Sequence, residues 1–167
     1  MKRILFIAAH RPDRSPSQRF RFEQYIEFLE KNGYHCKESC IINERDEKHF
    51  YNPGSFPFKA YIFLRSFAKR LFEFIRYYNY DIIFVHREAF MTGTTIFERL
   101  YKRTKAKLIF DFDDSIWIHN VSDANKKLSW LKSPEKTGKI IEMADLIFAG
   151  NQYLADYAKK FNSAVVI

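Results

Sequence analysis

Residues 108–117, Leu-Ile-Phe-Asp-Phe-Asp-Asp-Ser-Ile-Trp, constrain what this chain can fold into more than any other stretch. An apolar run that follows a helix-like segment and ends in carboxylates is typical of a buried parallel strand. Asp111, Asp113 and Asp114 stand at its carboxyl end, where the ligand crevice of an open α/β sheet lies. Acids this close destabilise one another's ionised forms, so they usually have a task or compensating partners. We regard them as candidate catalytic residues; the alternative is that they cap the next helix or pair with cations.

The rest of the chain alternates short apolar runs with amphipathic segments. Strands are expected at 4–9, 34–42, 81–86, 107–112, 146–149 and 164–167, and helices at 17–31, 59–78, 92–102, 135–144 and 152–161. This alternation indicates an α/β fold with a Rossmann-like, doubly wound parallel sheet in three α/β/α layers. The 167 residues are the size of one domain. Because the last run stops inside a sixth strand, we expect the chain to be part of a longer protein.

The net charge of +8 restricts the partners of the chain. Nucleic acid, an anionic membrane surface or phosphorylated ligands would each suit a basic protein. The basic residues are dispersed and no helix-turn-helix, zinc-finger or RRM signature is present, so nucleic acid is not expected. The apolar runs are shorter than the ~20 residues that span a bilayer. Cys36 and Cys40, four positions apart on an expected strand, are expected to be free thiols in a reducing compartment.

Three local patterns lead to specific structural expectations. Ser17 is expected to cap the helix at 17–31, and Gly33 follows the end of that helix. The segment 43–57, with two prolines and mixed charges, is expected to be a mobile surface loop. The aromatic, basic helix at 59–78 is expected to bury one apolar stripe in the core, with contact to an anionic membrane surface as the alternative. The stripe consists of Leu64, Phe67, Ala68, Leu71, Phe74, Ile75 and Tyr78.

The loop after the first expected strand is rich in side chains that can bind anions. It opens a helix and contains His10, Arg11, Ser17, Arg19 and Arg21. A helix amino terminus favours anions, and arginine forks match phosphate or carboxylate. We therefore expect these residues to contact an anionic ligand, with a solvated basic loop as the alternative.

Polar residues also follow two other expected strands. His86 and Arg87 end the strand at 81–86, and Gly150 and Asn151 follow the strand at 146–149. His86 would lie in the crevice, either in contact with a ligand or as a hydrogen-bonded structural residue. Gly150 would allow close backbone approach, and Asn151 would either contact ligand or cap the following helix.

The sequence Phe-Asp-Phe-Asp-Asp-Ser at 110–115 resembles the first motif of haloacid-dehalogenase-type phosphatases. That resemblance implies Asp111 as nucleophile and Asp113 as acid/base, with magnesium. The context differs, because three strand–helix units precede the motif and too few residues follow it for the remaining motifs. We keep this phosphatase, and a non-catalytic α/β binding module, as alternatives.

The whole chain resembles the amino-terminal half of a GT-B glycosyltransferase, family-4-like (glycosyl transferases group 1), of the kind found in bacterial polysaccharide gene clusters. The resemblance is carried by Lys-Arg-Ile-Leu-Phe-Ile at 2–7, Ser-Gln-Arg-Phe-Arg at 17–21, Leu-Glu-Lys-Asn-Gly at 29–33, the acidic stretch at 110–117 and Ala-Asp-Leu-Ile-Phe-Ala-Gly-Asn-Gln-Tyr-Leu-Ala at 144–155. The order and spacing of these segments are more specific than any one of them.

That resemblance implies that residues 1–167 are the acceptor-side domain of an enzyme whose nucleotide-sugar domain is absent from this chain. The enzyme would transfer a sugar from a nucleotide-sugar donor to a glycan or lipid-linked acceptor, without metal or other cofactor. It would be cytoplasmic and membrane-associated, peripheral at the inner membrane. The family's catalytic histidine position matches Asp113, which would act as general base or stabilise positive charge at the sugar, tuned by Asp111 and Asp114. The isolated chain is expected to be inactive.

Overall fold

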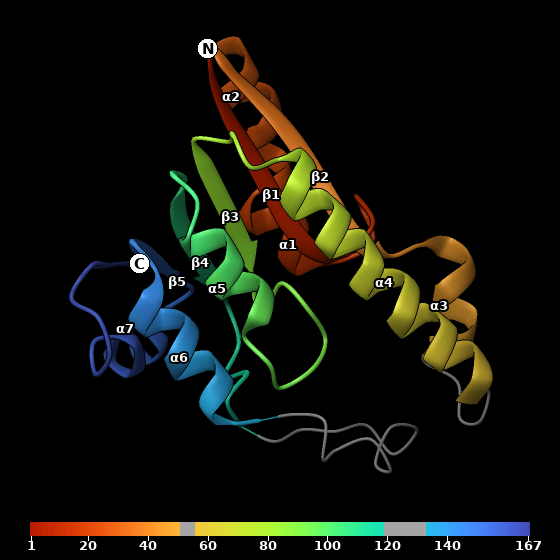
Figure 1. Cartoon of the computed structure of the whole chain (residues 1–167). Helices are drawn as coiled ribbons and strands as arrows, with labels where there is room; N and C mark the ends of the chain where they lie inside the picture. Colours follow the sequence, from red (N-terminus) through yellow and green to blue (C-terminus); the bar gives the residue numbers. More distant parts are fainter. Residues whose placement is uncertain (51–55, 119–132) are drawn as a thin grey trace.

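The computed structural model describes residues 1–50, 56–118 and 133–167, which form one parallel sheet between layers of helices (Figure 1). The strands are β1 (Lys2–His10), β2 (Tyr34–Ile42), β3 (Ile82–His86), β4 (Lys107–Phe112), β5 (Leu146–Ala149) and β6 (Val165–Val166). Their order is β2-β1-β3-β4-β5-β6, and each neighbouring pair is parallel. The direction of winding therefore reverses between β1 and β3. The predicted α/β class with a Rossmann-like parallel sheet is confirmed.

Two groups of helices cover opposite faces of the sheet. The helices α1 (Pro16–Arg21) and α2 (Ile26–Lys31), joined by the 3-10 turn η1 (Glu23–Tyr25), lie behind β1 in Figure 1. The helices α4 (Phe56–Arg76), α5 (Ile96–Lys102) and α6 (Glu135–Met143) lie in front. The remaining helices are α3 (Glu44–Phe50), which contacts α4, and α7 (Gln152–Ala158), which contacts β5 and β6. Neighbouring strand residues face different layers, because Leu5 belongs to the larger core cluster and Phe6 to the smaller one.

The helical segment after β1 differs from the single helix expected at 17–31. It is divided into α1, η1 and α2, and Ser15 precedes its first residue, so the prediction that Ser17 caps it is wrong. The hydroxyl of Ser17 instead lies 2.9 Å from Nε2 of His86. Gly33 follows the end of α2 as predicted, with a φ of 85° that glycine adopts without strain.

The segment after β2, predicted as a loop at 43–57, contains the helix α3. Asn43 and Asp46 form its amino-terminal cap, because each side chain accepts a hydrogen bond from the backbone N–H of the other, both at 2.9 Å. Arg65 of α4 also forms an ion pair with Asp46. The loop prediction is therefore wrong for α3 and for residues 56–57, which begin α4, and residues 51–55 lie outside the described part of the chain.

The orientation of α4 is opposite to the prediction. Most of the stripe expected in the core faces outward, and Leu64 and Ile75 have exposed fractions of 66 % and 69 %. Phe67 and Phe74 keep ring contacts with core aromatics. The buried residues of the helix are Lys59, Ile62, Ser66, Arg70 and Glu73. The helix therefore turns most of its charged side chains toward the sheet and much of its apolar surface toward solvent.

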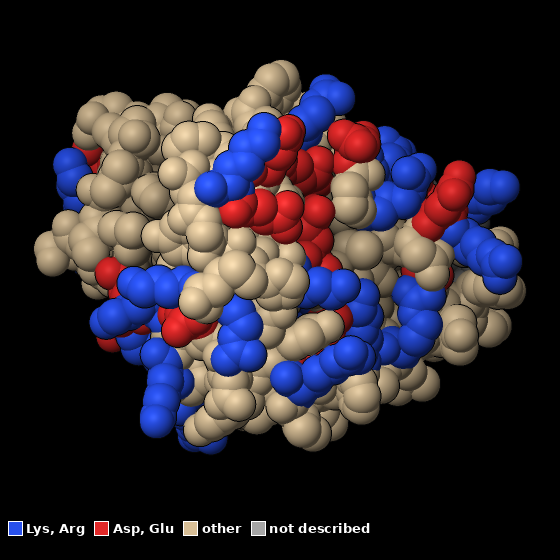
Figure 2. Space-filling view, turned by 90° about the horizontal axis from the view of Figure 1, so that it is seen from above, with Lys and Arg blue, Asp and Glu red and all other residues tan. Residues whose placement is uncertain are grey.

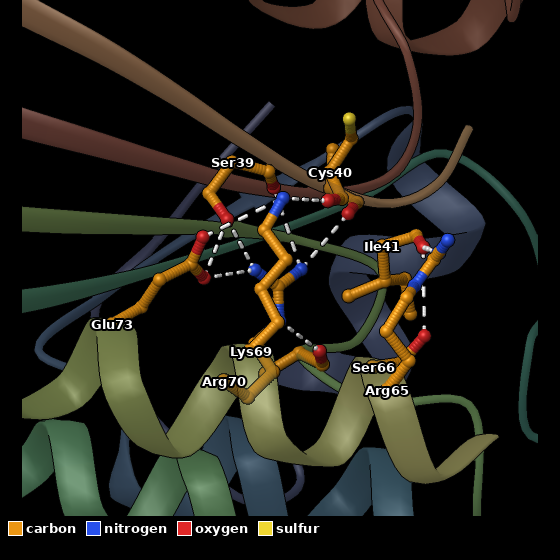
Figure 3. A network of polar contacts seen from close by, with 10 residues as sticks. Ser39, Cys40, Ile41, Arg65, Ser66, Lys69, Arg70 and Glu73 are labelled. Atoms are coloured by element: carbon orange, nitrogen blue, oxygen red, sulfur yellow. Dashed lines mark hydrogen bonds and ion pairs between the residues drawn. The ribbon is translucent and has the colours of Figure 1, made fainter. Parts of the chain in front are cut away.

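A buried polar network around Arg70 explains this orientation (Figure 3). The guanidinium donates to the backbone carbonyl of Ala89 at 2.8 Å, to that of Ala8 at 3.0 Å and to the Glu73 carboxylate at 2.8 Å. Its Nη1 also donates to the hydroxyl of Ser39, which in turn donates to Glu73 at 2.6 Å. A buried charge is tolerated only when it is paired and hydrogen-bonded in this way. The network holds α4 against β1, β2 and the loop after β3.

Among the residues that the structure describes, no helix has both the length and the hydrophobicity needed to cross a membrane. Basic side chains are spread over several parts of the face at which the strands begin, whereas acidic ones gather mainly near its middle (Figure 2). On this face the positive charge is dispersed and does not form one continuous groove.

Replacing Arg70 by alanine is expected to lower the free energy of unfolding by about 3–5 kcal/mol. The substitution leaves Glu73 buried without its cation and removes the donors to the carbonyl groups of Ala8 and Ala89. Arg76→Ala, at an exposed position of the same helix, is the matched control and should change stability by less than about 0.5 kcal/mol. Urea unfolding followed by circular dichroism measures both, and equal losses would contradict the role given to Arg70.

Candidate functional site at the carboxyl ends of the strands

The carboxyl ends of β1, β3 and β4 meet beside the point at which the winding reverses. In open α/β sheets the ligand crevice lies outside the strand ends at such a point. Parallel pairing places His86 at the end of β3 next to Asp111 near the end of β4. Helix α1, which follows β1, adds Ser17 and Arg21 to the same group. The structure therefore gathers polar residues from three separate parts of the sequence.

Asp111 is the centre of this group and is fully buried. Its Oδ1 accepts hydrogen bonds from Nε and Nη2 of Arg21, the first at 2.8 Å. Its Oδ2 lies 2.7 Å from Nδ1 of His86. Both carboxylate oxygens are thus occupied by side chains of the protein. Asp111 therefore holds the guanidinium of Arg21 and the ring of His86 in place.

The hydrogen bond between Asp111 and His86 determines which nitrogen of the imidazole can accept from Ser17. Because an ionised carboxylate only accepts, Nδ1 of His86 must carry a proton. The other ring nitrogen lies 2.9 Å from the Ser17 hydroxyl. That hydroxyl can therefore donate its proton to the second nitrogen of the neutral imidazole. Asp111, His86 and Ser17 thus form one hydrogen-bonded chain.

Asp113 is half-buried and lies between Ser17 and Arg87. Nε of Arg87 donates to its Oδ1 at 2.9 Å, while Nη2 of the same guanidinium donates to Asp114 at 2.8 Å. Burial by itself raises the pKa of the Asp113 carboxyl, but the Ser17 hydroxyl and the Arg87 cation outweigh it and hold that pKa below its ordinary value. The three neighbouring acids predicted from the sequence are therefore each compensated by a cation or a donor.

Arg87 has an unusual backbone conformation. Its φ is 63°, and the N–H of Glu88 donates to the carbonyl of His86 at 2.8 Å, which makes a tight turn centred on Arg87. Turns of this kind with positive φ are rare and strained, and the strain is greater for a residue with a side chain. The N–H of Arg87 donates to the carbonyl of Asp111 at 2.7 Å, which helps to hold the turn. Strained backbone of this type is concentrated at functional sites.

The other site residues predicted in the loop after β1, namely His10, Arg11 and Arg19, have different surroundings. His10 ends β1, and burial chiefly lowers the pKa of its imidazole; Glu47 opposes that effect, whereas the cations of Arg14 and Arg87 add to it. Arg11 approaches Glu47 of α3 at 3.7 Å. The guanidinium of Arg19 lies 5.5 Å from the ring centre of Phe20, and no contact with the site is seen among the described residues. Ser17 and Arg21 therefore lie at the strand-end group, as predicted for this loop. Arg19 does not lie there.

Gly150 and Asn151 have contacts within the protein that explain both residue types. A Cβ atom at position 150 would lie 2.9 Å from Cα of Asp113, so glycine permits the loops after β4 and β5 to touch. The side-chain oxygen of Asn151 accepts from the N–H of Leu154 at 3.0 Å and caps α7. The capping alternative for Asn151 is thus confirmed.

Sequence reasoning did not identify Gln18, which is buried beside the site. Its amide oxygen accepts from the N–H of His10 at 2.9 Å, and its amide nitrogen donates to the carbonyl of His10 at 3.0 Å. The side chain therefore satisfies the end of β1 as a neighbouring strand would. A lone glutamine in a basic loop gives no sequence signal for this function.

A pocket of about 470 Å³ opens beside the Arg87 side of the site. Its walls come from the loops after β3 and β4 and from the start of α6, and they include Arg87, Thr92, Asp114, Trp117, Lys136 and Thr137. Lys136 is buried and donates to the carbonyl of Thr92 at 2.6 Å and to Glu88 at 2.8 Å, which makes that wall rigid. The indole of Trp117 is stacked on Tyr157 with ring centres 3.7 Å apart. The volume and the mixed polar and aromatic lining are typical of a site for a small polar organic ligand.

The phosphatase alternative receives no support from this geometry. It requires Asp111 to attack phosphorus, yet both oxygens of Asp111 are bonded to Arg21 and His86. Within 1–50, 56–118 and 133–167, no three His, Cys, Asp or Glu side chains are grouped so that they could hold a metal ion.

The fold and the site define an α/β domain with a Rossmann-like parallel sheet and a compensated polar cluster at its switch point. Comparison with protein-family models and with curated proteins gives no match to this chain.

Replacing Arg87 by glutamine is expected to raise the pKa of the Asp113 carboxyl, because the cation that favours its ionised form is removed. A lowered pKa contributes stability that is lost as the pH falls through it, so in the variant this contribution should be smaller and should be lost at a higher pH. Carboxyl ¹³C NMR titration measures the pKa directly. Arg19→Gln is the control, and an Asp113 pKa that is the same in both variants would contradict the role of Arg87.

Proposed function

We propose that this chain is the acceptor-side domain of a GT-B glycosyltransferase, which transfers a sugar from a nucleotide-sugar donor to a glycan or lipid-linked acceptor. The observation that carries the proposal is the continuity between the Asp113 cluster and the adjacent pocket, which share Arg87. A reactive group beside a polar, aromatic-lined pocket is what the acceptor half of such an enzyme needs. The sequence resemblance and the fold class agree with this function.

In this proposal Asp113 acts mainly as a fixed negative charge. An efficient general base has a pKa near the working pH, whereas Arg87 and Ser17 hold the pKa of Asp113 low. An ionised carboxylate at the crevice would accept a hydrogen bond from the acceptor hydroxyl and stabilise positive charge that develops at the transferred sugar.

The pocket is the proposed site for the sugar of the acceptor. Trp117 offers an apolar ring face or edge, and Arg87 and Asp114 offer a donor and an acceptor for hydroxyl groups. The stack of Trp117 on Tyr157 fixes the indole before any ligand arrives, which reduces the ordering cost of binding.

The remaining parts of the proposal rest on the sequence resemblance. A second domain would bind the nucleotide sugar and would complete the cleft opposite Asp113. The enzyme would serve polysaccharide biosynthesis in the cytoplasm, peripheral at the inner membrane, and would use no cofactor.

The experiment that tests this function is a transfer assay on the complete protein encoded by the gene. Labelled nucleotide sugars are offered with a lipid extract of the source cells, and incorporation into the lipid fraction is measured. Asp113→Asn is expected to lower the transfer rate by about a hundredfold or more, because the charge and acceptor geometry at the reaction centre are lost.

The matched control is Asp156→Asn, an exposed acid of α7 whose side chain accepts from Gln152 at 2.6 Å. It should transfer at nearly the wild-type rate. Near-normal transfer by Asp113→Asn would overturn the role of Asp113. Magnesium-dependent phosphate release from an aryl phosphate by this chain alone would favour the phosphatase, and binding of a ligand without either reaction would favour a binding module.

A further inference from the structure

The outward face of α4 is a large apolar surface, which we call the α4 ridge. It consists of Phe56, Phe58, Tyr61, Leu64, Phe67, Leu71, Phe72, Ile75 and, just beyond the helix, Tyr78, each between 37 % and 69 % exposed. At about 200 Å² for a large apolar side chain, the ridge leaves on the order of 900 Å² in contact with solvent. Monomeric proteins rarely expose more than about 300–600 Å² of continuous apolar surface, and larger areas mark a binding surface.

The ridge cannot turn inward, because the opposite side of α4 is fixed to the sheet. Arg70 and Glu73 are buried in the network with Ser39, and Lys69 donates to the carbonyl of Cys40 (Figure 3). Rotating the helix to bury Leu64 and Ile75 would expose these partners and break their hydrogen bonds. The apolar exposure is therefore a fixed property of the fold.

The charged side chains that α4 and α5 themselves expose have one sign. Both carboxylates of α4 and α5, Glu73 and Glu98, are buried. The charged side chains of these two helices that reach solvent are cationic, and Arg76 and Arg99 are exposed among them. Two of the others pair with acids of neighbouring elements, Arg65 with Asp46 and Lys102 with Asp145.

We propose that the α4 ridge docks this protein on the surface of an anionic lipid bilayer. A stripe of aromatic and aliphatic side chains, on a helix whose solvent-exposed charges are all cationic, matches the requirements of a helix that lies in the bilayer interface. A second copy of the chain is the other occupant of suitable area. A two-fold interface would bring the same cationic margins together, and the resulting like-charge repulsion disfavours it.

Flotation with vesicles of phosphatidylcholine and phosphatidylglycerol, compared with vesicles of phosphatidylcholine alone, tests the inference on the full chain. The wild type should float with the anionic vesicles and bind the neutral ones more weakly. Phe72→Glu, at a position 63 % exposed, should weaken binding about tenfold or more, because an apolar side chain is replaced by a charge that anionic lipids repel.

Phe28→Glu on α2 is the matched control, since this side chain is 64 % exposed on the opposite side of the sheet. It should bind vesicles like the wild type, and circular dichroism should show that both variants are folded. The inference is overturned if the wild type does not float, or if both substitutions weaken flotation equally. It is also overturned, in favour of a second copy, if sedimentation shows a dimer that Phe72→Glu dissociates while vesicle binding is absent. These readouts do not depend on transferase activity.

Discussion

The buried guanidinium of Arg70 is the interaction on which the arrangement of this domain most depends. A single side chain joins α4 to the ends of β1 and β2 and to the loop after β3, by donating to Ala8, Ser39, Glu73 and Ala89. The charge is tolerated in the interior because neighbouring oxygens replace its hydration. Once this contact is made, the roll of α4 about its axis is fixed, and with it the surface that the domain presents on that side.

The polar cluster at the strand ends follows a related rule, in which each charge is compensated within the protein. Arg21 and His86 compensate Asp111 in the interior, and Arg87 compensates Asp113 and Asp114 nearer to solvent. In the inner group, both oxygens of Asp111 are hydrogen-bonded to Arg21 and His86, which fixes these three side chains relative to one another. The outer group is partly exposed, so a ligand with hydroxyl or phosphate oxygens can exchange contacts with it at little cost of reorganisation. The buried residue Asp111 therefore supports the cluster from within, whereas Asp113 and Asp114 are the acids that solvent can reach.

The sequence predicts the strands well and one of the long helices poorly, for a physical reason. The strands expected at 34–42, 107–112 and 146–149 coincide with β2, β4 and β5. Helical periodicity likewise shows that Leu64, Leu71 and Ile75 share a face, but it does not say which face is buried. The inward face of α4 is chosen by hydrogen bonds from Arg70 to backbone carbonyls far away in sequence, and no residue pattern records them.

The same distinction applies to the site. The strand-end rule brings His86, Asp111 and Asp113 to one edge, because parallel strands end together. The contact of Ser17 with His86 and the hydrogen bonds of Gln18 depend on how the chain turns after β1, which composition does not determine. Capping by Asn151, in contrast, is a local event within four residues, and the sequence predicts it directly.

Contact between the loops after β4 and β5 also bears on how this domain can diverge in evolution. The missing side chain at Gly150 makes room for the backbone of Asp113, not for its carboxylate. Residue 150 is therefore constrained by the path of the main chain, and residue 113 by the contacts of its side chain. A descendant could change the carboxylate at 113 and keep the glycine, whereas a side chain at 150 would require both loops to move. Substitution is thus tolerated more easily at position 113 than at position 150, although the two residues are in contact.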